Sequence, residues 1–239
     1  MERIIVLDKN LIKEKFENSI NFYDDNAIIQ ELMANKLVSL INRTSFNKIL
    51  EIGSYSGVLT KKIVEKFEFN SYLALDIVDS FEKIKHLSNK ISFKQIDVEK
   101  FSSNEKFDLI IANASLQWCN NFENTIKKLK SYLNKDGILA ITTFATDNFF
   151  EIRNAFSTSL KYKTIQELET IFSSNAKIIQ EIHTLQFKNA KKLLEHIKLT
   201  GVNAITKKSL TLGEIKNGLK IIEEDYQNKL TYKPIYIID

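Results

Sequence analysis

Two glycines and three acidic residues in the first half of the chain have the spacing of a nucleoside-binding site. Glu51, Gly53 and Gly57 lie in and just after one apolar run, and Asp76 and Asp97 follow two later runs. A glycine turn after a strand lets a ligand approach the backbone, and a carboxylate at the end of the next strand can accept hydrogen bonds from both hydroxyls of a ribose. Asp97 could accept in the same way from the exocyclic amine of adenine. The pattern predicts a site for a cofactor that contains a nucleoside.

The same segment argues against a phosphate-binding loop. A dinucleotide site needs G-x-G-x-x-G and a P-loop needs G-x-x-x-x-G-K-S/T, whereas this chain offers only Gly53 and Gly57, with Tyr55 between them. A cofactor with a ribose and an adenine but no phosphate fits better. Glu51, just before the turn, could orient the loop or help to hold a cationic amine.

The elements that must position these residues follow from the hydropathy pattern. The predicted strands cover residues 49–52, 72–76, 93–97, 107–113, 138–144, 176–187 and 232–238. The predicted helices cover residues 26–41, 58–67, 121–133 and 164–172, a segment that starts at Asn189, and another that a capping box at Thr211 opens. Asp136–Gly137 predicts a turn before the fifth strand. Strands that alternate with helices favour a mostly parallel sheet, and Pro234 places the last strand beside an edge.

Length and composition limit the class of protein. The 239 residues are 44% hydrophobic, and 34 basic against 30 acidic residues give a net charge of +4. This mild charge is unlike that of a nucleic-acid binder, and no apolar stretch has the length of a membrane span. Cys119 is the single cysteine, which excludes an internal disulfide. We expect one domain over residues 1–239, cytoplasmic, with no nucleic-acid partner and no membrane association.

The run from Glu51 to Gly57, followed by Asp76 and Asp97, resembles the first three motifs of class I S-adenosylmethionine-dependent methyltransferases. The resemblance implies an α/β, Rossmann-like sheet of seven strands in the order 3-2-1-4-5-7-6 with strand 7 antiparallel. It also implies S-adenosylmethionine as cofactor. The sequence pattern itself predicts an N-terminal helical cover (residues 1–45) and, because residues 145–163 carry no strand signal, a helical insertion after strand 5 that packs over the sheet edge as a lid. The implied cofactor-binding residues are Glu51, Gly53, Tyr55, Gly57, Asp76, Ile77, Asp97, Val98 and Asn113. Tyr55 stands where the family usually has its middle glycine, and its side chain would crowd the cofactor unless it points away.

A narrower resemblance covers nearly the whole chain. It rests on Phe22–Tyr23–Asp24 with Ala27 and Gln30, on residues 113–118 (Asn-Ala-Ser-Leu-Gln-Trp), on residues 199–204 (Leu-Thr-Gly-Val-Asn-Ala) and on residues 230–232. These segments are similar to the malonyl-acyl carrier protein O-methyltransferases of biotin synthesis. That family methylates the free carboxylate of a malonyl thioester. The implied partner is therefore acyl carrier protein with a malonyl thioester, or malonyl-coenzyme A.

Such a reaction asks little of acid–base residues. A malonyl carboxylate is ionised at neutral pH, so transfer needs positioning and desolvation rather than a general base. A buried anion calls for a counter-charge, for which Arg153 is the candidate and Lys161 the runner-up. Tyr23 could close over the carboxylate or the sulfonium of the cofactor, and Trp118 could form a wall of the pocket or pack beneath it. His86, His183 and His196 have no metal-ligand spacing, so no metal is expected.

Acyl carrier proteins are acidic, and lysine pairs could form a docking face for one. These pairs are Lys61–Lys62, Lys127–Lys128, Lys191–Lys192 and Lys207–Lys208. A solvated helix face is the plainer interpretation of each pair. Two alternatives to the function also stay open, namely a methyltransferase of another small-molecule acceptor and a non-catalytic partner protein that keeps the fold.

Overall fold

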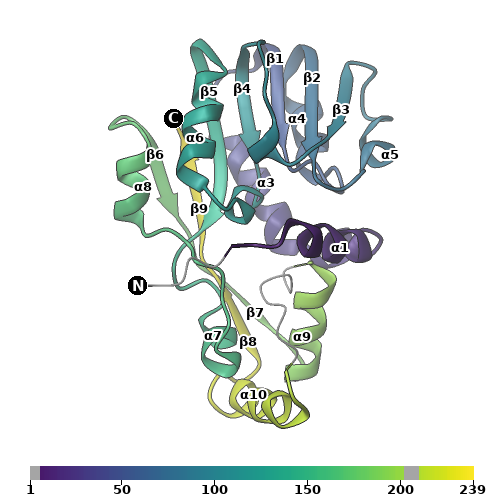
Figure 1. Ribbon diagram of the computed structural model, residues 1–239, viewed down its shortest axis with the longest axis vertical. Coiled ribbons are helices and arrows are strands. Elements are labelled where there is room, and N and C mark those ends of the chain that lie inside the picture. Colours follow the sequence, from purple (N-terminus) through teal and green to yellow (C-terminus); the bar gives the residue numbers. More distant parts are fainter. Residues whose placement is uncertain (1–5, 202–209) are drawn as a thin grey trace.

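The computed structural model describes residues 6–201 and 210–239. A seven-stranded sheet flanked by helices forms its larger part (Figure 1). In spatial order the strands are β3 (Ile91–Gln95), β2 (Glu68–Asp76), β1 (Ser45–Ile52), β4 (Phe107–Ala112), β5 (Leu133–Phe144), β9 (Pro234–Ile238) and β6 (Lys177–Gln180). β9 is antiparallel to both neighbours and the other pairs are parallel. Because β9 is the seventh strand of this sheet along the chain, the predicted order 3-2-1-4-5-7-6 is confirmed.

Seven α-helices accompany the large sheet. They are α1 (Lys9–Ser19), α2 (Tyr23–Asn26), α3 (Ile28–Ser39), α4 (Val58–Lys66), α5 (Phe81–Ile84), α6 (Phe122–Ser131) and α8 (Ile165–Ile171), with short 3-10 turns at Val98–Lys100 and Leu116–Trp118. α6 buries Ile126 and Leu129 against the sheet. The predicted capping box at Thr164 is present at the start of α8, where the Thr164 hydroxyl accepts from the Glu167 amide.

A smaller unit lies beyond one end of this sheet (Figure 1). It contains a two-stranded antiparallel sheet of β7 (His183–Gln186) and β8 (Lys229–Tyr232) and the helices α7 (Phe150–Phe156), α9 (Ala190–Leu199) and α10 (Leu212–Glu224). The capping box predicted at Thr211 opens α10. The insertion after β5 is helical, as expected, but α7 packs on α10 and β8 and not over the edge of the large sheet. Its role as a lid stays a prediction.

Two predicted strands are wrong, because each is divided between the two sheets. Residues 176–187 form β6 and β7, and residues 232–238 end β8 and form β9. Pro234 has no N–H to give to a ladder, and the Lys233 N–H donates to Asn148 Oδ1 at 3.0 Å. The ladder therefore breaks at this point and the chain passes from one sheet to the other. The turn predicted at Asp136–Gly137 is also wrong, since β5 runs through it with a shift of register against β4.

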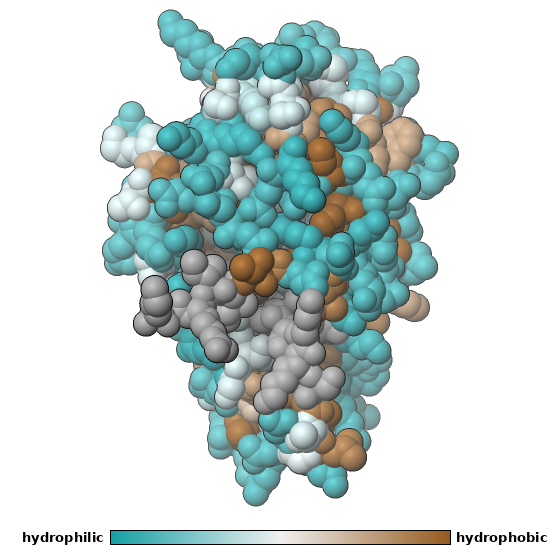
Figure 2. All heavy atoms as spheres, viewed as in Figure 1, coloured by the Kyte–Doolittle hydropathy of each residue, from teal (hydrophilic) through white to brown (hydrophobic). Residues whose placement is uncertain are grey.

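The outer surface contrasts with this core. Every residue of β4 is buried, whereas hydrophilic side chains cover most of the face shown in Figure 2. Within residues 6–201 and 210–239, no helix has the length and apolar character needed to cross a bilayer. Val202, Asn203 and Ala204 of the family-like segment, and the pair Lys207–Lys208, lie outside the described residues.

Candidate active site

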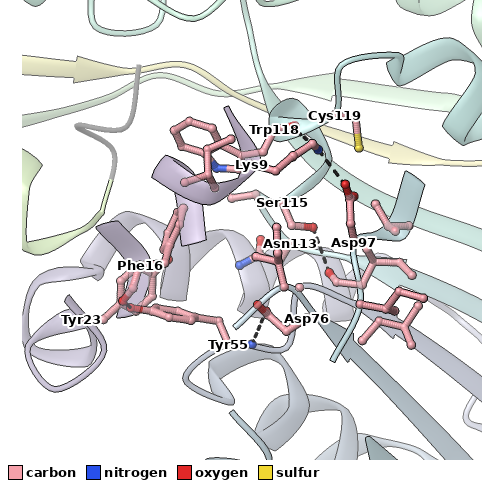
Figure 3. Close-up of a pocket in the computed structure, with 18 residues that line it drawn as sticks. Lys9, Phe16, Tyr23, Tyr55, Asp76, Asp97, Asn113, Ser115, Trp118 and Cys119 are labelled. Atoms are coloured by element: carbon pink, nitrogen blue, oxygen red, sulfur yellow. Dashed lines mark hydrogen bonds and ion pairs between the residues drawn. The ribbon is translucent and has the colours of Figure 1, made fainter. Parts of the chain in front are cut away.

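A cavity lies at the carboxyl ends of β1, β2 and β4, the end at which open parallel sheets bind ligands (Figure 3). The predicted site residues that line it are Tyr23, Gly53, Tyr55, Asp76, Ile77, Asp97, Val98, Asn113 and Trp118. Its other walls are Lys9, Ile12, Phe16, Ile52, Leu75, Ile96, Ala114, Ser115 and Cys119. Of the predicted residues, Glu51, Gly57 and Arg153 do not line it. The strands thus bring together residues that lie far apart in the sequence, and α1 covers them.

The loop after β1 requires glycine at two positions. Gly53 has φ +78°, and a Cβ there would lie 2.4 Å from the Cβ of Ser115. Gly57 has φ +88° at the start of α4, and a Cβ there would lie 2.9 Å from Ile84 Cγ2. Gly53 therefore lets the β4 loop close on the cavity, while Gly57 sets the packing of α4 behind it.

Tyr55 departs from the glycine of the family pattern and still adopts a positive φ of 35°. Its hydroxyl donates to Phe16 O at 2.6 Å and lies 3.0 Å from Ser19 Oγ, both at the end of α1. Its ring makes an edge-on contact with Tyr23, with 4.7 Å between the ring centroids. The side chain thus points toward the N-terminal helices and forms a wall of the cavity (Figure 3).

Asp76 has the geometry of a hydrogen-bond acceptor held in place by the backbone. Its Oδ1 accepts from Val78 N at 2.8 Å and its Oδ2 from Tyr55 N at 2.9 Å. Burial raises the pKa of Asp76 to about 6, although backbone bonds from Val78, Tyr55 and Ile77 act against the shift. A carboxylate has about four lone-pair sites, so acceptor capacity remains for a ligand beyond these backbone bonds. This capacity fits the hydroxyls of a ribose.

Lys9 is a cavity residue that the sequence analysis missed. Its Nζ lies 2.6 Å from Glu99 Oε2 and 3.5 Å from Asp97 Oδ1, and it donates to Trp118 O at 2.8 Å. These contacts tie the start of α1 to the loops after β3 and β4. No sequence signal distinguishes Lys9 from the many other lysines, because its partners lie about ninety or more residues further along the chain.

Glu51 lies beneath the loop and not on the cavity wall. It is fully buried, and its Oε2 accepts from Thr60 Oγ1 at 2.7 Å and from Tyr72 OH at 2.5 Å. Burial raises the pKa of Glu51 to about 7, and these two hydrogen bonds act against the shift. This placement supports the interpretation that Glu51 orients the loop.

Arg153 lies apart from the cavities described here. Its guanidinium contacts Asp147 Oδ1 at 3.3 Å, and its side chain is 42% exposed. Neither Arg153 nor Lys161 is among the residues that line either cavity. The structure therefore offers no contact that would support Arg153 as the counter-charge.

A second, smaller cavity adjoins the first and shares Phe16, Tyr23, Ala114 and Trp118 with it. Its remaining walls are Gln30, Gln117, Phe144, Phe149, Leu160, Tyr162, Thr200 and Tyr232. None of these described wall residues carries a charge. Tyr232 OH lies 2.6 Å from His196 Nε2, and burial lowers the pKa of His196 to about 4, so this pair is neutral at pH 7.

Three of the six non-glycine residues with positive φ in the described part of the chain lie at the two cavities. Tyr55, Ala114 and Phe149 all have positive φ, at 35°, 47° and 57°, although none is glycine. Each lines one or both cavities. Strained residues of this kind persist where the surrounding structure holds them, and they cluster at ligand sites. The two joined cavities are therefore the candidate active site.

Comparison with known proteins shows to which class of protein the chain belongs. The family model described as "Methyltransferase domain" matches residues 27–211. The fold is also that of the YcgJ protein of Bacillus subtilis, with a TM-score of 0.64 and 13% identity over 86% of this chain and 96% of that one. It is likewise that of the N-methyltransferase NodS of Bradyrhizobium japonicum, solved with S-adenosyl-L-homocysteine, with a TM-score of 0.58 and 14% identity over 95% and 96% of the two chains. The chain therefore contains a methyltransferase domain with the methyltransferase fold, as predicted.

Curated relatives show which methyltransferase family the chain belongs to. The chain is 33% identical to "Malonyl-[acyl-carrier protein] O-methyltransferase" of Calditerrivibrio nitroreducens over 95% of this chain and 94% of the relative. It is 31% identical to the protein of the same name from Chlorobium luteolum over 96% and 94%. The chain belongs to the malonyl-[acyl-carrier protein] O-methyltransferase family. The narrower resemblance of the sequence analysis is confirmed.

Proposed function

We propose that this protein transfers a methyl group from S-adenosylmethionine to the free carboxylate of a malonyl thioester on acyl carrier protein, an early step of biotin synthesis. The proposal extends to this chain what the names of its relatives state. The observation that carries it is the pair of joined cavities, one with the acceptors of a nucleoside site and the other aromatic and uncharged. Tyr23 and Trp118 stand in the wall that the two share.

The first cavity suits the cofactor. Asp76 would accept from the ribose hydroxyls, Asp97 from the adenine amine, and the Gly53 backbone would allow close approach. Ile77, Val98 and Asn113 would complete the walls, with Asn113 contributing through its backbone because its side-chain amide is bonded to Gln30 O and Thr142 Oγ1. When bound, S-adenosylmethionine supplies an electrophilic methyl group on a positively charged sulfur.

The second cavity suits the acceptor. Burial raises the pKa of Tyr23, Tyr162 and Tyr232, so all three side chains keep their protons at neutral pH. A carboxylate oxygen of the acceptor forms a bond to the methyl carbon while the carbon–sulfur bond breaks, with its electron pair left on sulfur. No proton moves, so no general base is needed. The walls contribute by excluding water and by holding the acceptor in place, effects that can lower a barrier by up to about 7–11 kcal/mol.

The test is a transfer assay with purified protein. Incubation with S-adenosylmethionine and malonyl-acyl carrier protein should give a carrier protein heavier by one methyl group in mass spectrometry. Malonyl-coenzyme A in a parallel reaction measures the preference for the carrier, and acetyl-acyl carrier protein, which has no free carboxylate, is the matched negative control. If calorimetry shows cofactor binding but neither malonyl thioester is methylated, the malonyl thioester is not the acceptor. If calorimetry detects no cofactor binding, the protein is not a methyltransferase enzyme at all.

The carrier-protein partner would use the exposed lysines. Lys191 and Lys192 are exposed on α9, which borders the second cavity through Thr200. Engagement within the chain does not separate the pairs, because Lys192 contacts Glu195 at 2.6 Å and Lys128 donates to Val98 O and Glu99 O. The α9 pair is favoured for an acidic partner by its position on a helix that borders the second cavity.

A further inference from the structure

Tyr162 has a hydroxyl proton that no hydrogen bond within residues 6–201 and 210–239 uses. The residue is 8% exposed and lines the second cavity, where its ring makes an edge-on contact with Phe144, with 6.0 Å between the ring centroids. Its oxygen accepts from Asn148 Nδ2 at 3.3 Å. Because a tyrosine hydroxyl can donate as well as accept, this bond leaves its donor free for a ligand.

The polarity of this bond follows from the other contact of Asn148. The Asn148 side chain is 1% exposed, and its Oδ1 accepts from Lys233 N at 3.0 Å. Since a backbone N–H can only donate, this contact fixes which end of the Asn148 amide is the oxygen, and the NH₂ end must face Tyr162. The Tyr162 oxygen is therefore the acceptor, and its proton points away from Asn148.

The other tyrosine that the later segments bring to this cavity is bound differently. Tyr232 OH lies 2.6 Å from His196 Nε2, so its hydroxyl already has a strong partner inside the protein. Burial raises the pKa of both tyrosines, so both are neutral at pH 7 and neither repels an anion. Of the two, Tyr162 is the one whose contacts leave the donor free.

A free donor in an uncharged cavity favours a ligand that is a strong acceptor. The described residues that line the cavity include no lysine, arginine or histidine, so a carboxylate buried there depends on neutral donors for its hydrogen bonds. A hydrogen bond from a hydroxyl to a carboxylate is short and contributes about 1.5–3 kcal/mol. It occupies one carboxylate oxygen and leaves the other with its lone pairs available for reaction.

We infer that Tyr162 donates a hydrogen bond to one carboxylate oxygen of the acceptor, while the other oxygen takes the methyl group as the carbon–sulfur bond breaks. The proton stays on Tyr162 throughout. This assignment rests on the proposed function, and it gives the carboxylate a neutral partner in place of Arg153. The ligand class is a carboxylate at the end of an acyl thioester, held in the cavity that adjoins the cofactor.

The test compares an anionic and a neutral ligand on a variant that lacks one hydroxyl. Binding of malonyl-acyl carrier protein and of its methyl ester is measured by calorimetry with S-adenosylhomocysteine present. Tyr162→Phe should weaken the binding of the malonyl form by roughly 10- to 100-fold, the equivalent of a hydrogen bond to a charged group, and that of the ester by less than about 5-fold. The same variant should raise KM and leave kcat nearly unchanged, because the bond is already made to the bound acceptor before transfer.

Tyr226→Phe is the matched control. The Tyr226 hydroxyl also accepts from an asparagine amide, Asn154 Nδ2 at 2.7 Å, but Tyr226 lines neither of the two cavities. This variant should bind both ligands as the wild type does. Asn148→Ala separates binding from stability, because it should destabilise the fold while Tyr162 keeps its proton, so binding of the malonyl form should change by less than about 5-fold.

The outcomes separate this inference from the proposed function. Equal binding of malonyl-acyl carrier protein by the wild type and Tyr162→Phe, with methyl transfer intact, overturns the role of Tyr162 only, and weaker binding in Arg153→Ala alone returns that role to Arg153. An equal loss for the acid and the ester also overturns it. If the wild type methylates succinyl-coenzyme A and no malonyl thioester, loss of succinyl-coenzyme A binding in Tyr162→Phe supports Tyr162 and overturns the malonyl acceptor. Unchanged S-adenosylhomocysteine binding shows that each variant is folded.

Discussion

Tyr55 shows at the scale of one residue how a departure from a glycine pattern is accommodated. Its amide donates to Asp76 and its hydroxyl to Phe16, so both ends of the residue are bonded. A positive φ at a non-glycine residue costs of order 1–3 kcal/mol, which these bonds offset. The sequence showed that Tyr55 replaces a glycine, but it did not show where the side chain points. Phe16 and Ser19, which bind its hydroxyl, lie on a helix whose position over the loop has no local sequence signal.

We expect Tyr55→Phe to loosen α1. The change removes the shorter of two side-chain hydrogen bonds to Phe16 O, the other coming from Ser19 Oγ at 3.2 Å, and should cost about 1 kcal/mol in the free energy of unfolding. Amide hydrogen exchange across Lys9–Ser19 should become faster, and S-adenosylhomocysteine binding weaker. Tyr132→Phe is the matched control, because the Tyr132 hydroxyl also contacts a backbone oxygen, at 3.4 Å, and its ring packs in a different core cluster from the residues of α1. Unchanged exchange in α1 would show that the hydroxyl does not hold it.

Glu51 makes the stability of the protein depend on pH. Burial raises its pKa from 4.5 to about 7. Between these values the folded state binds more protons than the unfolded state, so stability falls as the pH rises. From pH 5 to pH 8 the wild type should lose roughly 3 kcal/mol relative to Glu51→Gln, which does not titrate. Urea unfolding at both pH values measures this difference, and a constant difference would contradict the assignment.

At the scale of elements, the sequence predicted those helices and strands whose formation depends on the hydropathy pattern of their own residues. β4 and the last residues of β1 and β2 are buried on both faces and appear as continuous apolar runs, and the acids Asp76 and Asp97 after β2 and β3 line the cavity. The two divided strands were missed because a run such as residues 176–187 looks the same whether it stays in one sheet or changes to another. The change depends on Asn148, which meets Lys233 across 85 residues of sequence. Lys9 was missed for the same reason, since its partners are equally far along the chain.

Asn148→Ala should weaken the junction between the two sheets. Asn148 is 1% exposed, accepts from Lys233 N and donates to Tyr162 OH at 3.3 Å. The part-buried Lys233 N–H and the buried Tyr162 hydroxyl would each lose a partner, at a cost of about 1–3 kcal/mol. Urea unfolding measures the loss. Asn154→Ala removes a 2.7 Å bond to Tyr226 at an exposed site nearby and should change stability by less than about 0.5 kcal/mol, so equal losses would contradict the role of Asn148.

At the scale of the whole molecule, the two cavities draw on different parts of the chain. All described walls of the first lie between Lys9 and Cys119, whereas the second takes Phe149, Leu160, Tyr162, Thr200 and Tyr232 from later segments. Those segments form the smaller unit and its connections to the large sheet (Figure 1).

The junctions at residues 181–182 and at Lys233 therefore mark where the molecule could be recombined. A chimera that exchanges residues 145–163 and 183–232 with those of a relative would replace most of the later walls of the second cavity and leave the first intact. The choice of acceptor can then change, in evolution or by design, without a change in cofactor binding. The wall that the two cavities share, with Phe16, Tyr23 and Trp118, must be retained in either case.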